Sequence, residues 1–583
     1  MKDIRWNLAT MYEDESQIEK DIDLLRKAGE ELKALAENPK ANLKQILEHM
    51  EANYRKGSHL INYTNMKQDE DSRIAQSQKN YGEANQAFVQ YNASLSFLRP
   101  YLLSLTKDEK KDLLADENFA GYHEYLERVF RYSDHTLSDK EEYILSRLSF
   151  ADEAPSDIYY YLTNADMKFP AVESLDNHEL TAENFTTLQK NPKTEVRKES
   201  FDKLYTVFNS FGNTISNAYF NNVRSLTTRA EFRGFSSALE MELFEDDVDP
   251  KVYEALIESI HKNISFLHRY YKKKKELLGL DEQHMYDVYL PLVKGQQKEY
   301  SFEEARDLCI ASVAPLGEEY QAIYRSAFED GWIDVYPREG KRGGAYSSGS
   351  YDSYPFISMN FNGTLDSVFT LAHEMGHSMH SYYAKKNNDF LYHGYTIFAA
   401  EVASTFNERL LLNYLYDHAE TEADRLELLD HELDSFKSTV YRQTMFAEFE
   451  KIVHDRVEKQ EALTKDDFDR IYLDLNKKYF GDHMISDDLI SHEWMRIPHF
   501  YRDFYVYKYA TGYCAATVLS EKVLRGGEDD LAAYLSFLKD GSHHFPIDQL
   551  KAAGADMSKP ETIDGALEVF GRLVERIEAI DRL

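Results

Sequence analysis

The chain has 583 residues, of which 43% are hydrophobic and 29% are charged, a composition that fits a folded globular protein and excludes a disordered or fibrous one. With 68 lysine and arginine residues against 102 aspartate and glutamate residues, the formal net charge is -34, so we expect neither a nucleic-acid partner nor a membrane partner. The longest apolar runs, such as Leu410–Leu412, are far shorter than the about 20 residues that a membrane-spanning helix needs.

The first residues and the cysteine content indicate a protein that stays where it is made. Met1–Leu8 lacks the apolar segment and the cleavage site of a secretory signal, so we expect a cytoplasmic location. Cys309 and Cys514 are too few for a disulfide framework or a thiolate metal cluster. We expect both to be buried, reduced thiols.

The N-terminal region, residues 1–112, is expected to be helical. Apolar residues recur in it at helical spacing, for example Ile22, Leu25 and Leu32, with dense charged residues between them. This pattern is typical of helical hairpins.

Residues 113–188 are expected to form a small separate lobe. It combines helices with a hairpin, which is predicted where Phe169–Val172 and Glu179–Thr181 alternate with a period near two. The remaining residues, 189–583, are expected to form one large domain.

Long helices are predicted at 194–232 and 250–278, and then the composition changes once. Trp332–Tyr336 and Pro355–Phe361 have the composition of strands. Gly340–Gly349, between them, is predicted to form flexible turns and matches neither a phosphate loop nor a nucleotide-binding fingerprint. The chain is therefore expected to be mainly α with one small β-sheet.

A pair of histidines follows the predicted sheet. His373 and His377 are four residues apart on one predicted helix, which Thr364 can cap, so both can present a ring nitrogen to one zinc ion. Glu374 leaves this helix about 100° from His373 and can reach a water molecule on the same ion as a general base. Because such a short pattern also arises by accident, a third ligand is needed to support the interpretation.

The third ligand is predicted to be Glu401. It lies between apolar residues, where a buried carboxylate needs a cation, and Ser404 and Glu408 follow it at positions suited to hydrogen-bonding the ligands. A salt-bridged glutamate in the core is the alternative interpretation. His380 is roughly 10 Å of helical rise from His373, which is too far to complete the same site, so we expect it to pack or hydrogen-bond beside it.

The spacing of these residues excludes other classes of hydrolase. The metzincin pattern requires glycine and histidine where this chain has His380 and Tyr383. The sequence contains no nucleophile elbow of the form G-x-S-x-G, and neither cysteine has a catalytic partner. Serine and cysteine hydrolases are therefore not indicated.

Four blocks of the chain resemble the zinc oligopeptidases related to thimet oligopeptidase and neurolysin, and within them the oligoendopeptidase F group. The blocks are Arg342–Ser347, Phe369–Tyr383, Phe398–Glu408 and Ile497–Gly512. The resemblance is strong from about residue 200 to the C-terminus and looser before it. It implies a mainly α, two-lobed, neurolysin-like body with a deep channel for short unstructured peptides. It also implies one zinc ion per chain, bound by His373, His377 and Glu401.

The fourth block contains a histidine and several tyrosines, whose N–H and O–H groups are suited to stabilise the oxyanion of a tetrahedral intermediate. The resemblance implies this role for His499, Tyr501 and Tyr507. The alternation of tyrosines also allows Tyr505 or Tyr509 in their place. Any one of these tyrosines could instead be an ordinary interfacial aromatic.

The glycine-rich block, with Gly343, Gly344, Ala345 and Tyr346, is expected to contact the substrate and to flex over it as a lid. An extended peptide could also pair with the exposed edge of the small sheet.

Together these patterns and the resemblance predict a zinc metallo-endopeptidase that cuts internal bonds of short oligopeptides, as a monomer or a weak homo-oligomer. Zinc would polarise the water and the scissile carbonyl, and Glu374 would transfer the proton. Two alternatives stay open. A zinc carboxypeptidase on a related scaffold would need a cation for the terminal carboxylate, and a catalytically silent peptide-binding module would have no need of Glu374.

Overall fold

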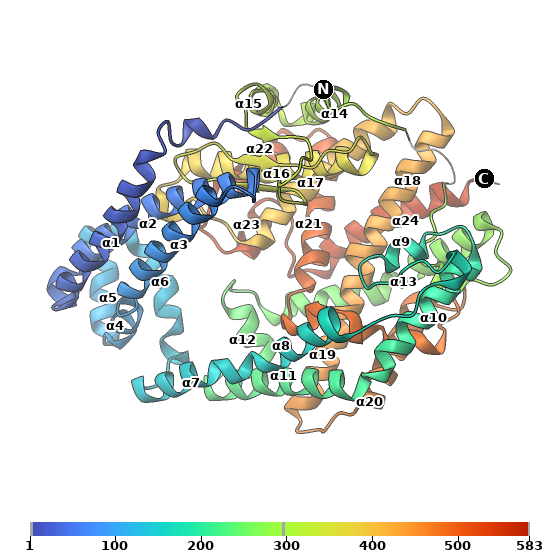
Figure 1. Ribbon diagram of the computed structural model, residues 1–583, viewed down its shortest axis with the longest axis horizontal. Coiled ribbons are helices and arrows are strands. Elements are labelled where there is room, and N and C mark those ends of the chain that lie inside the picture. The colour runs from blue at the N-terminus through green and yellow to red at the C-terminus, as the bar shows by residue number, and fades with distance from the viewer. Residues whose placement is uncertain (1–3, 294–297, 581–583) are drawn as a thin grey trace. The chain divides into compact units, whose positions relative to one another are not determined.

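The computed structural model describes residues 4–293 and 298–580, and α-helices dominate it, with one small β-sheet, as expected (Figure 1). The chain divides into two compact units, each built from several stretches of sequence. Unit 1 comprises residues 1–136, 297–415 and 519–554, and unit 2 comprises residues 137–296, 416–518 and 555–583. The three domains expected from the sequence remain a prediction.

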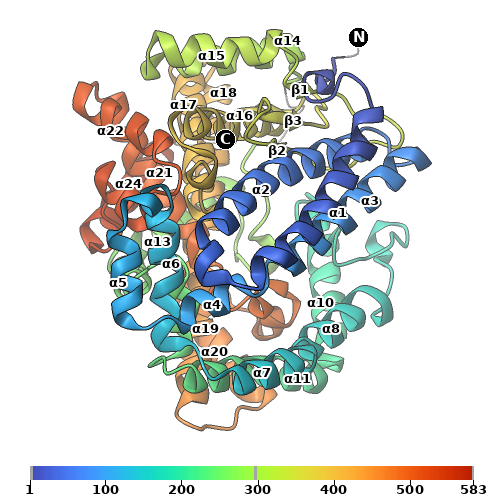
Figure 2. The ribbon, with the colours of Figure 1, turned by 90° about the vertical axis from the view of Figure 1, so that its left-hand side faces the viewer.

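The N-terminal part of unit 1 forms the predicted helical hairpins. Its helices are α1 (Ser16–Ala36), α2 (Pro39–Glu70), α3 (Ala75–Ser94), α4 (Leu98–Ser104), α5 (Lys107–Ala115) and α6 (His123–Phe130). α2 begins where Pro39 follows the capping residue Asn38, whose side chain accepts a hydrogen bond from the N–H of Ala41. α1, α2 and α3 pack side by side and bury their apolar faces against one another (Figures 1 and 2).

The sheet has three short strands in the order β1-β3-β2. β1 (Ile333–Asp334) runs parallel to β3 (Phe356–Ser358), and both lie in segments with predicted strand composition. β2 (Tyr346–Ser348) is antiparallel to β3 and corrects the prediction, because it lies in the glycine-rich segment that was expected to form turns only. Beyond β1, the N–H of Val335 bonds the carbonyl of Ile4, whereas in the described chain β2 has no strand on its outer side.

The later stretches of unit 1 contribute further helices, of which α16 packs against the sheet. They are α14 (Phe302–Ser312), α15 (Glu318–Glu329), α16 (Leu365–Asn387), α17 (Ile397–Asp417), α22 (Glu528–Lys539) and α23 (Pro546–Ala552). α16 begins as predicted at Thr364, whose side chain accepts a hydrogen bond from the N–H of Ser367. Because α16 packs against β2, β3, α14 and α22, it is held on several sides.

Unit 2 is helical. Its helices are α7 (Asp139–Asp152), α8 (Ala154–Tyr161), α9 (Phe185–Gln189), α10 (Thr194–Ser210), α11 (Gly212–Phe232), α12 (Ala238–Phe244), α13 (Pro250–Leu278), α18 (Glu422–Phe436), α19 (Arg442–Glu458), α20 (Lys465–Phe480), α21 (Tyr507–Leu524) and α24 (Pro560–Glu578). The π-helical turn Lys437–Tyr441 joins α18 to α19. The division between the units falls inside α17 and α21.

The helix predicted at 250–278 is confirmed as α13, whereas the one predicted at 194–232 is interrupted at Phe211. The predicted hairpin is reduced to a single antiparallel bridge between Val172 and His178, because Asp176 and Asn177 adopt left-handed conformations that turn the chain at once.

Both cysteines are buried free thiols, as expected. None of the described helices combines the length and the apolar character that crossing a bilayer requires.

A buried ionic network in unit 2 anchors the segment that leads to His499. Glu493 is 2% exposed and accepts hydrogen bonds from Arg442 at 2.7 Å and from the hydroxyl of Tyr472 at 2.6 Å. Arg496 lies 3.3 Å from the same carboxylate. Although burial opposes ionisation, the charges of Arg442 and Arg496 and the hydrogen bonds lower the pKa of Glu493 to about 2. The carboxylate therefore stays charged and holds both arginines.

We predict that Glu493→Gln lowers the free energy of unfolding by about 3–5 kcal/mol near pH 7, because two arginines lose their buried counter-charge. An unfolded glutamate has a pKa of about 4.3, so the wild-type contribution is present above that value and is lost as pH falls toward about 2. Chemical unfolding near pH 7 and at about pH 3 measures both effects. Glu319→Gln, which breaks an exposed pair with Lys386, is the control and is expected to change little. Unchanged stability of Glu493→Gln near pH 7 would contradict the account.

Candidate metal centre

A close crossing of α16 and α17 builds the site, and the two helices lie side by side in both views (Figures 1 and 2). A Cβ atom added at Gly376 would lie 2.6 Å from Cα of Ser404 and 2.8 Å from the carbonyl oxygen of Ala403. Only glycine permits this approach without moving backbone. The sequence prediction does not include Gly376, although small residues at 376 and 403 are the signal that two helices can meet closely.

Three side chains from this crossing converge, namely His373, His377 and Glu401. Their possible ligand atoms all lie within 4.8 Å of one another, and in the described part of the chain this is the one group of its kind. Nε2 of His373 is 3.1 Å from Nε2 of His377 and 3.8 Å from Oε2 of Glu401. Two imidazole nitrogens and one carboxylate oxygen form a ligand set typical of catalytic zinc.

Glu408 orients the first of these histidines. Its Oε1 hydrogen-bonds Nδ1 of His373, which leaves Nε2 directed at the other two ligands. Burial lowers the pKa of His373, but the hydrogen bond and charge of Glu408 and the charges of Glu374 and Glu401 outweigh it and raise the value to about 9. Burial and the positive charge of His373 lower the pKa of His377 to about 3.

Glu374 lies beside the ligands with an unused hydrogen-bonding atom. It is 7% exposed, and its Oε2 has no hydrogen-bond partner. Burial, together with the charges of Glu401 and Glu408, raises its pKa to about 7, although His373 and a backbone hydrogen bond from Ser347 act in the opposite direction. Burial and the charge of Glu408 also raise the pKa of Glu401. A cluster of carboxylates with so little counter-charge fits a divalent cation.

His380 packs beside the site and is not part of the ligand group. It is 1% exposed and stacks on Tyr395 with ring centroids 3.7 Å apart, and burial lowers its pKa to about 3. The hydroxyl of Tyr395 donates to the carbonyl of His377 at 3.3 Å. The stacked pair therefore supports the helix that carries the histidines.

The glycine-rich block is fixed to the rest of unit 1. Gly343 and Gly344 are exposed, and Ala345 and Tyr346 are half-buried. The hydroxyl of Tyr346 donates to Asp69 at 2.7 Å, and Nδ2 of Asn360 donates to the carbonyl of Gly344 at 2.7 Å. Nδ2 of Asn360 also donates to the carbonyl of Arg342 at 3.0 Å, so the chain is tied down on both sides of Gly343.

The histidine and tyrosine group lies in unit 2. The ring of His499 lies 6.0 Å from that of Tyr509, which in turn lies 5.4 Å from that of Tyr505, and all three are half-buried. Tyr507 is fully buried, with its ring 5.3 Å from that of Tyr253. Since α21 begins at Tyr507, Tyr505 and Tyr509 are four residues apart at a helix start, and the two rings meet while Tyr507 points inward.

Tyr501 is half-buried and stacks on Tyr159 with ring centroids 4.5 Å apart. Its hydroxyl has no hydrogen-bond partner, and burial raises its pKa. Burial and the charge of Arg502 lower the pKa of His499. Neutral imidazole and phenol groups are therefore the forms present near neutral pH.

We predict that Gly376→Ala destabilises the protein by about 1–3 kcal/mol and weakens zinc binding, because α17 must move away and take Glu401 with it. Thermal unfolding and a zinc titration against a competing chelator measure the two effects. Gly82→Ala in α3 is the matched control, since its added Cβ meets nothing within 4 Å, and it is expected to stabilise by about 0.5–1 kcal/mol. Zinc affinity equal to that of wild type in Gly376→Ala would show that the crossing does not position the ligands.

Comparison with known proteins gives matches over most of the chain. Residues 187–569 match peptidase family M3, and residues 102–169 match a family described as oligopeptidase F. Oligopeptidase PepF of Bacillus subtilis (strain 168) is 41% identical over 524 residues, which cover 89% of this chain and 78% of that protein.

Two solved structures share the fold along nearly the whole chain. A Chlamydophila abortus protein described as a peptidase superposes with a TM-score of 0.92 at 32% identity, covering 99% of this chain and 98% of that one. An oligoendopeptidase-F from Enterococcus faecium superposes with a TM-score of 0.74 at 31% identity, covering 96% of this chain and 99% of that one.

Proposed function

Because this chain belongs to peptidase family M3, we propose that it is a zinc metallo-endopeptidase that hydrolyses internal bonds of short, unstructured oligopeptides. The observation that carries the proposal is the convergence of His373, His377 and Glu401 beside the buried carboxylate of Glu374. The three converging side chains would hold one zinc ion. When bound, the ion would polarise a water molecule and the carbonyl of the scissile bond.

Glu374 is the proposed general base. Its Oε2 has no partner within the protein and is therefore available to take a proton from the attacking water. The same carboxyl group then returns this proton to the nitrogen of the leaving amine. A buried carboxylate is suited to both steps because desolvation brings its pKa toward neutrality.

The open edge of β2 is the proposed site for the backbone of the substrate. Among the described strands, β2 pairs with β3 alone, and an extended peptide can add to its other side through main-chain hydrogen bonds. Ser347 in β2 also bonds Ser378 of α16 at 2.8 Å, so the strand is tied to the helix that carries the histidines. Recognition through the backbone would leave cleavage tolerant of the side chains in the peptide.

We assign stabilisation of the oxyanion to His499 and its neighbouring tyrosines. The sequence favours Tyr501 and Tyr507. The half-burial of Tyr505 and Tyr509 and the contact of Tyr509 with His499 support these two in place of Tyr507, whose side chain is enclosed by protein. Tyr501 remains a candidate through its hydroxyl, which has no partner.

We predict that Glu374→Gln lowers kcat by about 10²–10⁴ and leaves zinc bound, because it removes the base and keeps all three ligands. The assay uses peptides of increasing length that are blocked at both ends, with and without a zinc chelator. Asp366→Asn, an exposed acidic residue on the same helix, is the control and is expected to keep full activity. Turnover within a few-fold of wild type in Glu374→Gln would contradict the mechanism. Cleavage confined to peptides with a free C-terminus would favour a carboxypeptidase.

We predict that Tyr509→Phe lowers kcat by about 10²–10³ with little change in KM, because one donor to the oxyanion is lost. Tyr507→Phe is the matched variant and is expected to change kcat little, since this side chain packs inside unit 2. A larger loss of kcat in Tyr507→Phe than in Tyr509→Phe would contradict this assignment and identify Tyr507 as the donor to the oxyanion.

We predict that Gly344→Ala raises KM several-fold, whereas Gly343→Ala does not. Gly344 has a φ of +81°, which an alanine side chain opposes, while an added Cβ at Gly343 meets nothing within 4 Å. Steady-state kinetics on one blocked peptide measures both variants. Equal KM values for Gly344→Ala and wild type would end the proposal that this loop closes over the substrate.

A further inference from the structure

Exposed apolar side chains are concentrated in one part of unit 2. Of the fourteen large hydrophobic side chains that are exposed in the described chain, eight lie on α7, α8 and the last residue of α11. They are Tyr143, Ile144, Leu148, Phe150, Ile158, Tyr160, Tyr161 and Phe232. Apolar surface gathered in this way indicates a binding surface.

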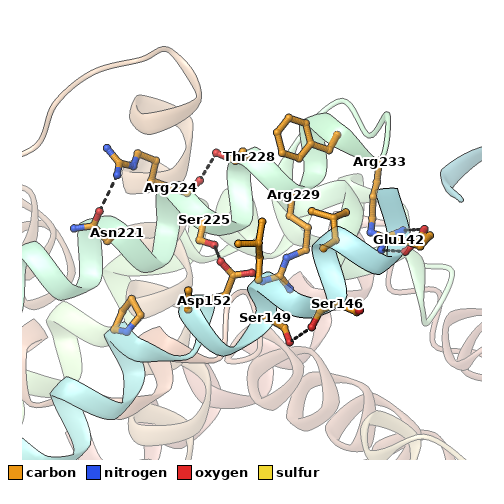
Figure 3. A pocket seen from close by; sticks show the side chains of 15 residues that line it. Glu142, Ser146, Ser149, Asp152, Asn221, Arg224, Ser225, Thr228, Arg229 and Arg233 are labelled. Carbon is orange, nitrogen blue, oxygen red and sulfur yellow. Dashed lines mark hydrogen bonds and ion pairs between the residues drawn. The ribbon is translucent and has the colours of Figure 1, made fainter. Parts of the chain in front are cut away.

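A groove of about 550 Å³ runs between α7 and α11 (Figure 3). The two helices meet through polar contacts at its two ends. Arg233 pairs with both oxygens of Glu142 at 2.9 Å, and at the other end the hydroxyl of Ser225 donates to Asp152 at 2.6 Å while Arg229 lies 3.2 Å from the same carboxylate. No residue of α7 is buried. The face of α7 that is turned toward α11 is therefore not closely packed against it.

The lining of the groove combines apolar side chains with polar ones. Leu145, Leu148 and Phe232 contribute apolar surface. The hydroxyls of Ser146 and Ser149 donate to carbonyls one turn back in α7, at 2.9 Å in both cases. Because these hydroxyls already donate to backbone carbonyls, a ligand in the groove does not need to accept a hydrogen bond from them.

The groove adjoins a second hollow, of about 360 Å³, beside the proposed oxyanion-stabilising residues. Asp152, Ser225 and Arg229 line both. Tyr501 and Tyr505 line the second hollow. The two hollows therefore meet at these three residues, and a chain bound at these tyrosines would cross over the contacts of Asp152 with Ser225 and Arg229 to enter the groove.

Arg224 gives the groove a positive charge that is not neutralised. It is exposed on α11, donates to Oδ1 of Asn221 at 3.0 Å, and has no carboxylate within ion-pair distance among the described residues. Arg229 and Arg233, by contrast, are paired with carboxylates of α7. A guanidinium group in this state is suited to a carboxylate brought by a ligand.

We propose that the groove between α7 and α11 is an extended subsite that binds one flank of a peptide substrate, a flank that carries apolar side chains and a carboxylate. The apolar side chains lie against Leu145, Leu148 and Phe232, and the carboxylate pairs with Arg224. The inference rests on the proposed peptidase function. It explains how binding energy is gained beyond the scissile bond, from a flank with these two chemical features.

Steady-state kinetics on matched peptides tests the subsite. A blocked core peptide that the wild type cleaves is compared with the same core extended, at either end, by a short tail of leucine and phenylalanine. At the C-terminal end, one form of the tail ends in a free carboxylate, one is amidated, and one is amidated but contains an aspartate, which separates a terminal carboxylate from an acidic side chain. At the N-terminal end the tail is acetylated and is used with and without an aspartate. We expect the carboxylate-bearing tail at one end to lower KM about tenfold in wild type.

Two pairs of variants assign this effect to the groove. Ser149→Trp fills it and is expected to remove the advantage of the tail without changing cleavage of the core, whereas Ser149→Ala leaves it open. Arg224→Gln is expected to make the carboxylate-bearing and neutral tails equal. Arg147→Gln, on an exposed arginine of α7 that does not line the groove, is the control and is expected to keep the difference.

Equal KM values for core and tailed peptides in wild type, or an advantage that survives Ser149→Trp and Arg224→Gln, would overturn the subsite while leaving the peptidase function intact. A change of oligomeric state in Ser149→Trp, measured by sedimentation, would overturn it in favour of self-association. Failure of the wild type to cleave even the core peptide would overturn the proposed function instead.

Discussion

Repulsion among three carboxylates on the facing sides of α16 and α17 is the constraint on which the candidate site depends. Glu374, Glu401 and Glu408 surround His373, and burial raises the pKa of the first two. A divalent cation held by His373, His377 and Glu401 would remove this repulsion and link the two helices. The glycine at the helix crossing allows the two helices, and with them the carboxylates, to come close. The close packing of the helices is therefore also the cause of the repulsion.

The rest of each unit holds its functional groups in place. In unit 1, the sheet and the helices that pack around α16 fix the helix that carries both histidines, and Glu408 fixes the orientation of His373. In unit 2, the buried pairing of Glu493 with Arg442 and Arg496 fixes the segment before His499. Both arrangements hold side chains through several contacts, as precise positioning of a reacting bond requires.

Local patterns in the sequence were sufficient to predict the helix of the candidate metal site, because its start depends on the cap at Thr364 and the shared face of its two histidines on a four-residue spacing. The apolar neighbours of Glu401 were sufficient to select it as the third member of the group. The strand at Tyr346–Ser348 could not be predicted, because it forms only through its pairing with β3 and the glycine-rich segment around it favours turns. The inward orientation of Tyr507 was also out of reach, since the alternation of tyrosines allowed Tyr505 or Tyr509 in its place and did not show that a helix begins at Tyr507. The division into two units depends on contacts between distant stretches of chain, which no local pattern records.

X-ray absorption at the zinc edge of the purified protein, combined with its metal content, tests the central claim most directly. The account predicts one zinc ion per chain, with two imidazole nitrogens and oxygen ligands at about 2.0–2.1 Å. His377→Ala should lower the number of imidazole ligands to one. A protein that binds no zinc, or a zinc ion with three imidazoles or with sulfur ligands, would contradict it.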